Sequence, residues 1–214
     1  MAGGYEQGAE SVRAQIERGE SDPASFRAAL LSVPPAERDA WLDRVLGLGE
    51  IPDDEPALPT GCVPYLPCAV DALLRVVEHA PVCESDVVVD IGAGVGRAAA
   101  LLHLTTGATV IGLEIQPRLV AAARDLAERL LLSRTTCVEG DAVKLARLMS
   151  IGSIFFLYCP FSGERLRALV ASLEDVARTK TIRICCVDVP MPYVPWLVPE
   201  SVAPDLMIYR STLY

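Results

Sequence analysis

The stretch "VVVDIGAGVGR" at residues 87–97 constrains the fold more than any other part of the sequence. Its β-branched start, Val87 to Val89, is typical of a strand that is buried on both faces. The glycines at 92, 94 and 96 then indicate a turn whose backbone approaches another group closely. A strand that passes through a glycine-rich turn into a helix presents backbone N–H groups to a nucleotide. The stretch therefore predicts the first strand–turn–helix unit of a nucleotide-binding α/β domain.

Strand and helix patterns alternate on both sides of this unit. We expect helices over 68–79, 97–105, 117–132, 142–149 and 162–177, and strands over 86–91, 108–114, 135–140, 153–159 and 181–188. This alternation predicts a mostly parallel sheet with right-handed crossovers. Five prolines between 190 and 204 precede a last strand over 205–214, which suits an antiparallel strand or hairpin at the sheet edge.

The first part of the chain is predicted to be a helical cap and acidic connector over 1–58, ahead of the main domain over 59–214. The segment "SDPASFRAALLSV" carries Asp22 as an N-cap and Pro23 at the first helical position. The segment "PPAERDAWLDRVLGLG" starts with prolines and ends in glycines, as a helix often does. The segment "EIPDDEPALP" is acidic and interrupted by prolines, which is typical of a connector.

Composition excludes several classes of function. The 214 residues are 51% hydrophobic and carry a net charge of −9, which argues against nucleic-acid binding. The amino-terminal sequence resembles no secretory signal, and no apolar run reaches the length of a membrane span, so we expect a cytoplasmic protein with no membrane contact. Seven cysteines without a CxxC pair indicate free thiols, and with His79 and His103 the only histidines, no metal site is expected.

The spacing of the glycines bears on the kind of nucleotide. The dinucleotide fingerprint is GxGxxG, whose third glycine lets the helix pack against the strand beside a pyrophosphate. Here the spacing is GxGxG, and Arg97 stands where that fingerprint needs its last glycine. This disfavours NAD, while a turn with a purely structural role stays an alternative.

Three consecutive predicted strands end in an acid at the carboxyl edge of the sheet, where ligands bind in open α/β folds. Asp90 ends the first strand, and Glu114 ends the second, 24 residues later. The Glu114 carboxylate could accept both hydroxyls of a ribose diol. Asp141 follows the third strand and could accept from an adenine amino group, while the Ala142 N–H could donate to the ring.

The motifs "VVDIGAGVGR", "GLEIQP" and "EGDA", in this order and spacing, resemble those of the class I, seven-strand S-adenosylmethionine-dependent methyltransferases. The resemblance covers about residues 60–214 and implies a Rossmann-like α/β fold: a mostly parallel seven-strand sheet with helices on both faces, here with an N-terminal helical extension. It implies S-adenosyl-L-methionine as the cofactor. The cofactor-binding residues that it implies are Tyr65, Asp90, Gly92, Ala93, Gly94, Gly96, Glu114, Ile115, Asp141 and Ala142.

The methyl acceptor is predicted from the end of the fourth strand, "FFLYCPFSGE". Methyltransferases that act on amide or adenine nitrogens carry an Asn/Asp-Pro-Pro-Tyr/Phe motif there, whose polar side chain holds the NH2 group. Cys159 cannot provide that donor and acceptor pair, so these acceptors are disfavoured. Tyr158 is instead predicted as a catalytic residue that orients an amine, although a plain core role for this aromatic is about as well supported.

The segments "VPYLP" and "PWLVPES" resemble those of small seven-strand protein-lysine methyltransferases, in which the loop around Tyr65 covers the cofactor. We therefore expect a protein or small-molecule amine as acceptor, with a protein lysine as one candidate. The alternatives are a small-molecule methyltransferase of another kind, a non-catalytic module that binds S-adenosylmethionine, and a nicotinamide-dependent oxidoreductase. The helical cap is expected to form a lid over the acceptor side.

Overall fold

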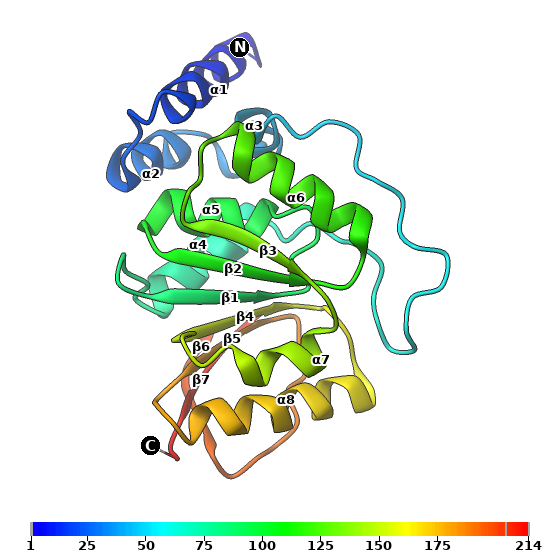
Figure 1. Ribbon diagram of the computed structural model, residues 1–214. Helices are drawn as coiled ribbons and strands as arrows, with labels where there is room; N and C mark the ends of the chain where they lie inside the picture. Colours follow the sequence, from blue (N-terminus) through cyan, green and yellow to red (C-terminus); the bar gives the residue numbers. More distant parts are fainter. Residues whose placement is uncertain (1, 204, 214) are drawn as a thin grey trace.

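The computed structural model describes residues 2–203 and 205–213, and a seven-stranded sheet lies at its centre (Figure 1). The strand order is β3-β2-β1-β4-β5-β7-β6, with β1 to β5 parallel and the β6–β7 hairpin antiparallel. The strands are β1 (Val87–Ile91), β2 (Thr109–Glu114), β3 (Thr135–Glu139), β4 (Ile154–Tyr158), β5 (Arg183–Val187), β6 (Leu197–Ala203) and β7 (Leu206–Ser211). The predicted fold class is confirmed.

Helices cover both faces of the sheet, and β1, β4 and β5 are therefore buried on both sides. The helices after the connector are α4 (Val70–His79), α5 (Arg97–Thr106), α6 (Pro117–Arg129), α7 (Ala142–Leu145), the short 3-10 helix η2 (Ala146–Leu148) and α8 (Gly163–Ala177). The apolar faces of α4 and α5 and the end of α6 share one buried cluster. Those of α7 and α8 share another with the opposite side of the strands.

The predicted helices of the amino-terminal part are α1 (Ala2–Glu17), α2 (Pro23–Leu31), η1 (Pro35–Glu37) and α3 (Arg38–Leu46). Asp22 is the N-cap of α2, and its Oδ1 accepts from the Ala24 and Ser25 N–H groups at 3.0 Å. Phe26, Leu30, Trp41 and Leu42 are buried in the same cluster as α4 and α5. These helices therefore contribute to the main core, and the division into two domains at residue 58 stays a prediction.

The lid role expected of the amino-terminal helices stays a prediction, and α2 lies away from the carboxyl edge of the sheet, where ligands bind. α2 packs on α5, and its Pro23 lies beside Gly107, which precedes β2 at the amino edge of the sheet. α1 packs on α3 (Figure 1). Only α3 approaches the carboxyl edge, where its Asp39 accepts from the Val70 N–H at 3.0 Å. That contact supplies the missing cap of α4, which begins at Val70, two residues after the predicted start.

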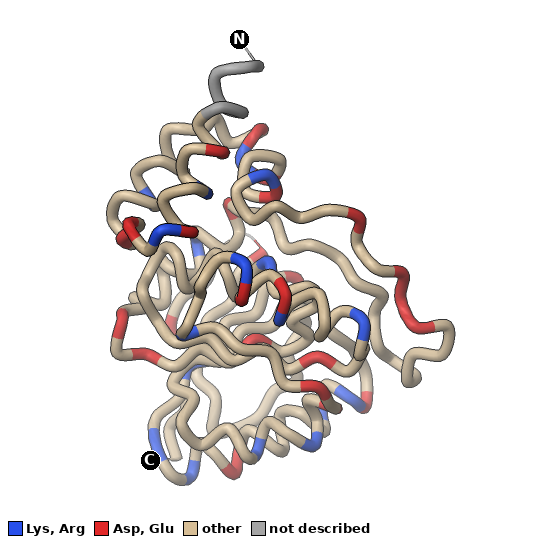
Figure 2. Tube along the Cα trace, turned by 45° about the horizontal axis from the view of Figure 1, so that its top comes forward, with Lys and Arg blue, Asp and Glu red and all other residues tan. Residues whose placement is uncertain are grey.

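The polypeptide between α3 and α4 crosses the carboxyl edge of the sheet. We call residues 51–66 the strap; it forms the long loop at the right of Figure 1. The strap pairs with the segment after β4: the Val63 N–H donates to the Pro160 carbonyl at 3.2 Å, and the Ser162 N–H donates to the Gly61 carbonyl at 3.0 Å. Figure 2 shows acidic positions along this connector.

The tail forms a hairpin at the sheet edge, one of the two arrangements predicted for it, in which β6 pairs with β7. β6 is the outermost strand, so Pro199 removes no hydrogen bond from a central ladder, and the register shifts between Pro199 and Ser201. Among the helices of the described residues, none combines the length and apolar character that a membrane span requires.

Candidate functional site

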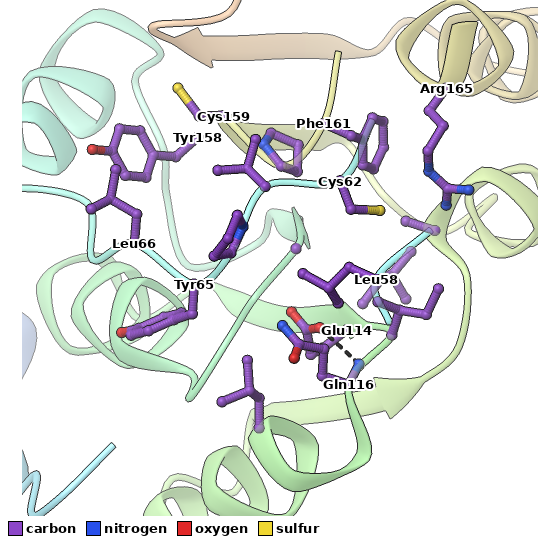
Figure 3. A pocket seen from close by; sticks show the side chains of 18 of the residues that line it. Leu58, Cys62, Tyr65, Leu66, Glu114, Gln116, Tyr158, Cys159, Phe161 and Arg165 are labelled. Atoms are coloured by element: carbon purple, nitrogen blue, oxygen red, sulfur yellow. Dashed lines mark hydrogen bonds between the residues drawn. The ribbon is translucent and has the colours of Figure 1, made fainter. Parts of the chain in front are cut away.

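A cavity of about 600 Å³, part of it open to solvent, lies between the strap and the carboxyl ends of β1, β2 and β4 (Figure 3). Its lining residues are Leu58, Cys62, Val63, Pro64, Tyr65, Leu66, Gly92, Leu113, Glu114, Ile115, Gln116, Leu119, Gly140, Ala142, Tyr158, Cys159, Pro160, Phe161 and Arg165. Tyr65 and Tyr158 stand at one end, and Phe161 and Arg165 at the other (Figure 3). A smaller cavity beside it is lined by Asp90, Ala93, Tyr65 and Tyr158, among others.

The glycine turn after β1 has the close contacts that its sequence predicts. Gly92, Gly94 and Gly96 have φ angles of 79°, 55° and 78°, a region that other residues rarely adopt. A Cβ built on Gly94 would lie 2.2 Å from the Tyr65 ring, and one on Gly92 would lie 2.9 Å from Pro160. Hence the strap and the segment after β4 both press on this turn, which has no room for larger residues.

Glu114 is buried, with 6% of its surface exposed. Its Oε2 accepts from the Gly94 N–H and its Oε1 from the Gln116 N–H, each at 2.9 Å. The carboxylate therefore connects the glycine turn to the start of α6 while it lines the cavity. The two backbone N–H groups compensate the burial of this carboxylate.

Asp90 is the most deeply buried acid of the site, with 2% of its surface exposed. Its Oδ2 has no hydrogen-bond partner among the described residues. Burial, and secondarily the neighbouring Glu114, raises the pKa of the Asp90 carboxyl to about 7. An unpartnered carboxylate beside a cavity favours a ligand that brings a positive charge or a hydrogen-bond donor.

Asp141 stands at the N-terminus of α7, where its Oδ1 accepts from the Val143 N–H at 3.0 Å. The same oxygen accepts from Arg165 Nη2 at 2.5 Å, and the Arg165 guanidinium lies 5.4 Å from the centre of the Phe161 ring. Ala142 lines the larger cavity, whereas Asp141 is absent from its lining. Asp141 is thus already engaged with this chain's own groups, which the sequence did not predict.

The structure separates the other predicted cofactor residues into those at the cavities and those behind them. Tyr65, Gly92 and Ile115 line the larger cavity, and Ala93 lines the smaller one. Gly94 and Gly96 line neither cavity. A Cβ on Gly96 would meet Ala123 of α6 at 3.1 Å, so Gly96 serves helix packing.

Arg97 is among the residues that line the smaller cavity, but its guanidinium is engaged in contacts within the chain. Its guanidinium donates to the Cys68 carbonyl at 2.6 Å, to Asp43 at 2.5 Å and to Asp39 at 2.8 Å. Only 5% of its side chain is exposed. The residue that replaces the last glycine of the dinucleotide fingerprint therefore joins α5 to α3.

Tyr158 ends β4 and lines both cavities. Burial, followed by the nearby Cys68, Cys159 and Asp188 groups, raises the pKa of its phenol. Cys159 has φ 41°, and its Sγ lies 3.1 Å from the Asp188 carbonyl. Asp188 is exposed at the carboxyl end of β5, beside β4.

Several site residues were missed by sequence reasoning. They are Leu58, Cys62, Gln116, Arg165 and Asp188. Asp188 could have been found, because this acid directly follows β5, just as Glu114 ends β2. The strap residues could not, since their place over the cavity depends on pairing with a segment about 100 residues later in the chain.

Residues 88–180 match the family model of a methyltransferase domain. The chain is similar to an RNA methyltransferase from Salinibacter ruber crystallised with S-adenosyl-L-homocysteine, at 24% identity over 69% of this chain and 94% of that one, with a TM-score of 0.53. It is also similar to a putative methyltransferase, yhhF, from Escherichia coli, at 20% identity over 74% of this chain and 92% of that one, with a TM-score of 0.55. A comparison with curated proteins found no match.

Residues 88–180 therefore form a methyltransferase domain, and the seven-strand sheet and the glycine turn have the class I arrangement. The domain is that of an enzyme, an S-adenosylmethionine-dependent methyltransferase.

Proposed function

We propose that this enzyme transfers the methyl group to an amine nitrogen, carried by a protein lysine or by a small molecule. The observation that carries the proposal is the position of Tyr158, whose side chain lines both cavities at the end of β4. In a class I sheet the reacting end of the cofactor lies between the first and fourth strands. Tyr158 is therefore the side chain best placed to contact an acceptor.

Three features in and beside the cavities support S-adenosylmethionine as their ligand. The unpartnered Asp90 Oδ2 provides a site for the methionine ammonium. The Glu114 oxygens each keep a lone pair for the ribose hydroxyls after accepting the Gly94 and Gln116 N–H groups. Ala142 and Phe161 offer apolar contacts for the adenine, and Asp141 Oδ2 is the oxygen left to accept from its amino group.

When bound, the cofactor supplies a methyl group on a sulfonium, so transfer depends mainly on alignment of the acceptor and exclusion of water. The raised pKa keeps the Tyr158 phenol protonated near neutral pH. It can then donate to or accept from an amine without acting as a base. The exposed Asp188 carboxylate nearby favours the approach of a cationic acceptor.

A matched pair of acceptors tests this proposal. A basic peptide with one lysine and the same peptide with norleucine are incubated with enzyme and S-adenosylmethionine, and S-adenosylhomocysteine is measured. We expect product only with lysine, at a rate that rises between about pH 7 and 9 as more amine is deprotonated. Turnover of small amines alone would identify a small-molecule enzyme, and turnover of RNA or of hydroxyl acceptors alone would overturn the proposal. Cofactor binding without turnover of any acceptor would indicate a non-catalytic module.

Tyr158→Phe tests the acceptor residue. We expect kcat to fall by roughly 10²-fold or less, the lower range for a positioned proton-handling group, with little change in S-adenosylhomocysteine affinity. Tyr209→Phe is the matched control, because this half-buried tyrosine lies on β7 away from both cavities. An altered melting temperature with unchanged kcat would mean that Tyr158 is an ordinary packing residue.

A further inference from the structure

The strap is fastened to the sheet edge at one buried side chain. Gln116, 4% exposed, uses both ends of its amide for this contact. Its Nε2 donates to Asp54 Oδ1 at 2.7 Å, and its Oε1 accepts from the Glu55 N–H at 2.7 Å. Asp54 Oδ1 also accepts from the Tyr65 N–H at 2.9 Å. Two points of the strap, eleven residues apart in sequence, are thus joined to each other and to Gln116.

The same network reaches the residues proposed to hold the cofactor. The Gln116 N–H donates to Glu114 Oε1, and Glu114 Oε2 accepts from the Gly94 N–H (Figure 3 shows Glu114 and Gln116 in contact). The ring of Tyr65 packs against Gly94, so the strap also contacts the glycine turn. Strap, carboxylate and turn therefore form one closed set of contacts around the rim of the cavity.

The strap also provides a whole wall of the larger cavity, through Leu58, Cys62, Val63, Pro64, Tyr65 and Leu66. The other walls come from the turn after β1, the ends of β2 and β4 with the segments that follow them, and the start of α7. A ligand between these walls is covered by the strap. The strap is held by hydrogen bonds at Asp54 and Gln116, in addition to its backbone pairing with the segment after β4. Such bonds can open and close locally without unfolding of the sheet.

We infer that Asp54 and Gln116 are positioning residues whose hydrogen bond, which we call the clasp, holds the strap over the cofactor. S-adenosylmethionine then enters and leaves when the clasp opens. The inference rests on the proposed function of the larger cavity as the cofactor site. Asp54 and Gln116 touch no reacting atom; they act through Tyr65 and Glu114. Their loss should therefore change the rates of cofactor binding and release more than the rate of methyl transfer.

Asp54→Ala removes the acceptor for two N–H donors, one of them the buried Gln116 amide. We expect the dissociation rate of S-adenosylhomocysteine to rise about tenfold or more, because hydrogen bonds to a charged group are involved. The KM for S-adenosylmethionine should rise while kcat changes little. Asp54→Asn keeps an Oδ1 acceptor and should restore most of the wild-type behaviour. Asp53→Ala is the matched control, an exposed acid one residue earlier.

Hydrogen exchange in the free enzyme tests the clasp without any ligand. Asp54→Ala and, as a second variant, Gln116→Leu should speed exchange in peptides that cover 54–66 and leave those of β1, β4 and β5 unchanged. Equal exchange and equal dissociation rates in Asp54→Ala and Asp53→Ala would overturn the inference. If the wild-type enzyme bound no S-adenosylhomocysteine, the proposed cofactor site would be wrong, whereas strap exchange that matched wild type in both clasp variants would refute the clasp alone.

Discussion

Asp90 is the residue whose ionisation depends most on what binds beside it. It is buried, one of its oxygens lacks a partner among the described residues, and its pKa is raised to about 7. A bound ammonium group would stabilise the carboxylate and lower that pKa. A group that is costly to bury in the free enzyme therefore becomes favourable once a cation sits beside it, a pattern common at functional sites.

This burial makes stability depend on pH in a defined direction. The folded state keeps the Asp90 proton up to about pH 7, while the unfolded chain loses it near the ordinary value of 3.8, so stability falls as pH rises through this window. We expect Asp90→Asn to flatten the fall. It should raise the free energy of unfolding at pH 8 by on the order of a few kcal/mol, while it abolishes cofactor binding. Denaturant melts between pH 4 and 8 measure the effect. Asp175→Asn, at an exposed acid, is the control, and parallel pH curves for the Asp90 variant and wild type would contradict the assignment.

A comparison of Gly94 with Gly163 separates the effect of steric contact from that of backbone strain. Its φ of 55° nearly equals the 60° of Gly163, but a Cβ on Gly94 would strike Tyr65, whereas Gly163 has no atom within 4 Å of the same position. Both alanine variants carry similar strain, of order 1 kcal/mol. Only Gly94→Ala should displace the strap and weaken S-adenosylhomocysteine binding, by about tenfold or more by calorimetry. Equal affinities in the two variants would show that Tyr65 moves aside freely.

At the scale of elements, α3 is the helix that joins the amino-terminal part to the methyltransferase core. Asp39 and Asp43 of α3 hold Arg97 of α5, and Asp39 also caps α4. Trp41 is 5% exposed and lies 6.0 Å from the Phe26 ring of α2. The cluster that contains these aromatics continues into α4 and α5. The amino-terminal helices are therefore a covering for one side of the core.

Shortening of the Trp41 side chain tests this role. Trp41→Ala should lower the free energy of unfolding by about 3–5 kcal/mol, the range for large-to-small changes of a buried tryptophan. Leu31→Ala, at a residue 47% exposed on α2, should have little effect. Loss of turnover by Trp41→Ala with a normal melting temperature would support a lid after all, since a lid residue would affect catalysis without affecting stability.

Across the whole molecule, charge decides which acceptors approach easily. The chain has a net charge of −9, and acidic positions follow the connector beside the site (Figure 2). Such a field attracts cations and repels nucleic-acid phosphates. It supports a basic protein or an amine as acceptor.

Salt therefore provides a test of the long-range field. The KM for a lysine-containing basic peptide should rise several-fold between about 0.05 and 0.5 M salt, because the Debye length falls below the distance between surface charges. The KM for S-adenosylmethionine, whose contacts are buried, should change less. A peptide KM that does not respond to salt would show that the acceptor is selected at short range only.

The amino-acid sequence by itself determined the order of strands and helices, the glycine turn and the acids at the ends of β1 and β2. These features depend on local periodicity, turn chemistry and spacing along one βαβ unit, so a reader of the sequence can find them. The Asp22 cap is another case, since the capping side chain and its N–H partners are neighbours in the chain.

Only the tertiary structure decided what those residues contact. Arg97 became the link to α3, Glu114 became a buried acceptor of two N–H groups, and Asp141 paired with Arg165. The strap lies over the cavity because it pairs with the segment after β4 and because Gln116 holds Asp54. Each of these contacts joins residues more than 15 positions apart along the chain, with the single exception of the Gln116 N–H to Glu114. Their formation depends on how the packed elements meet in space, and no periodic pattern in the sequence records it.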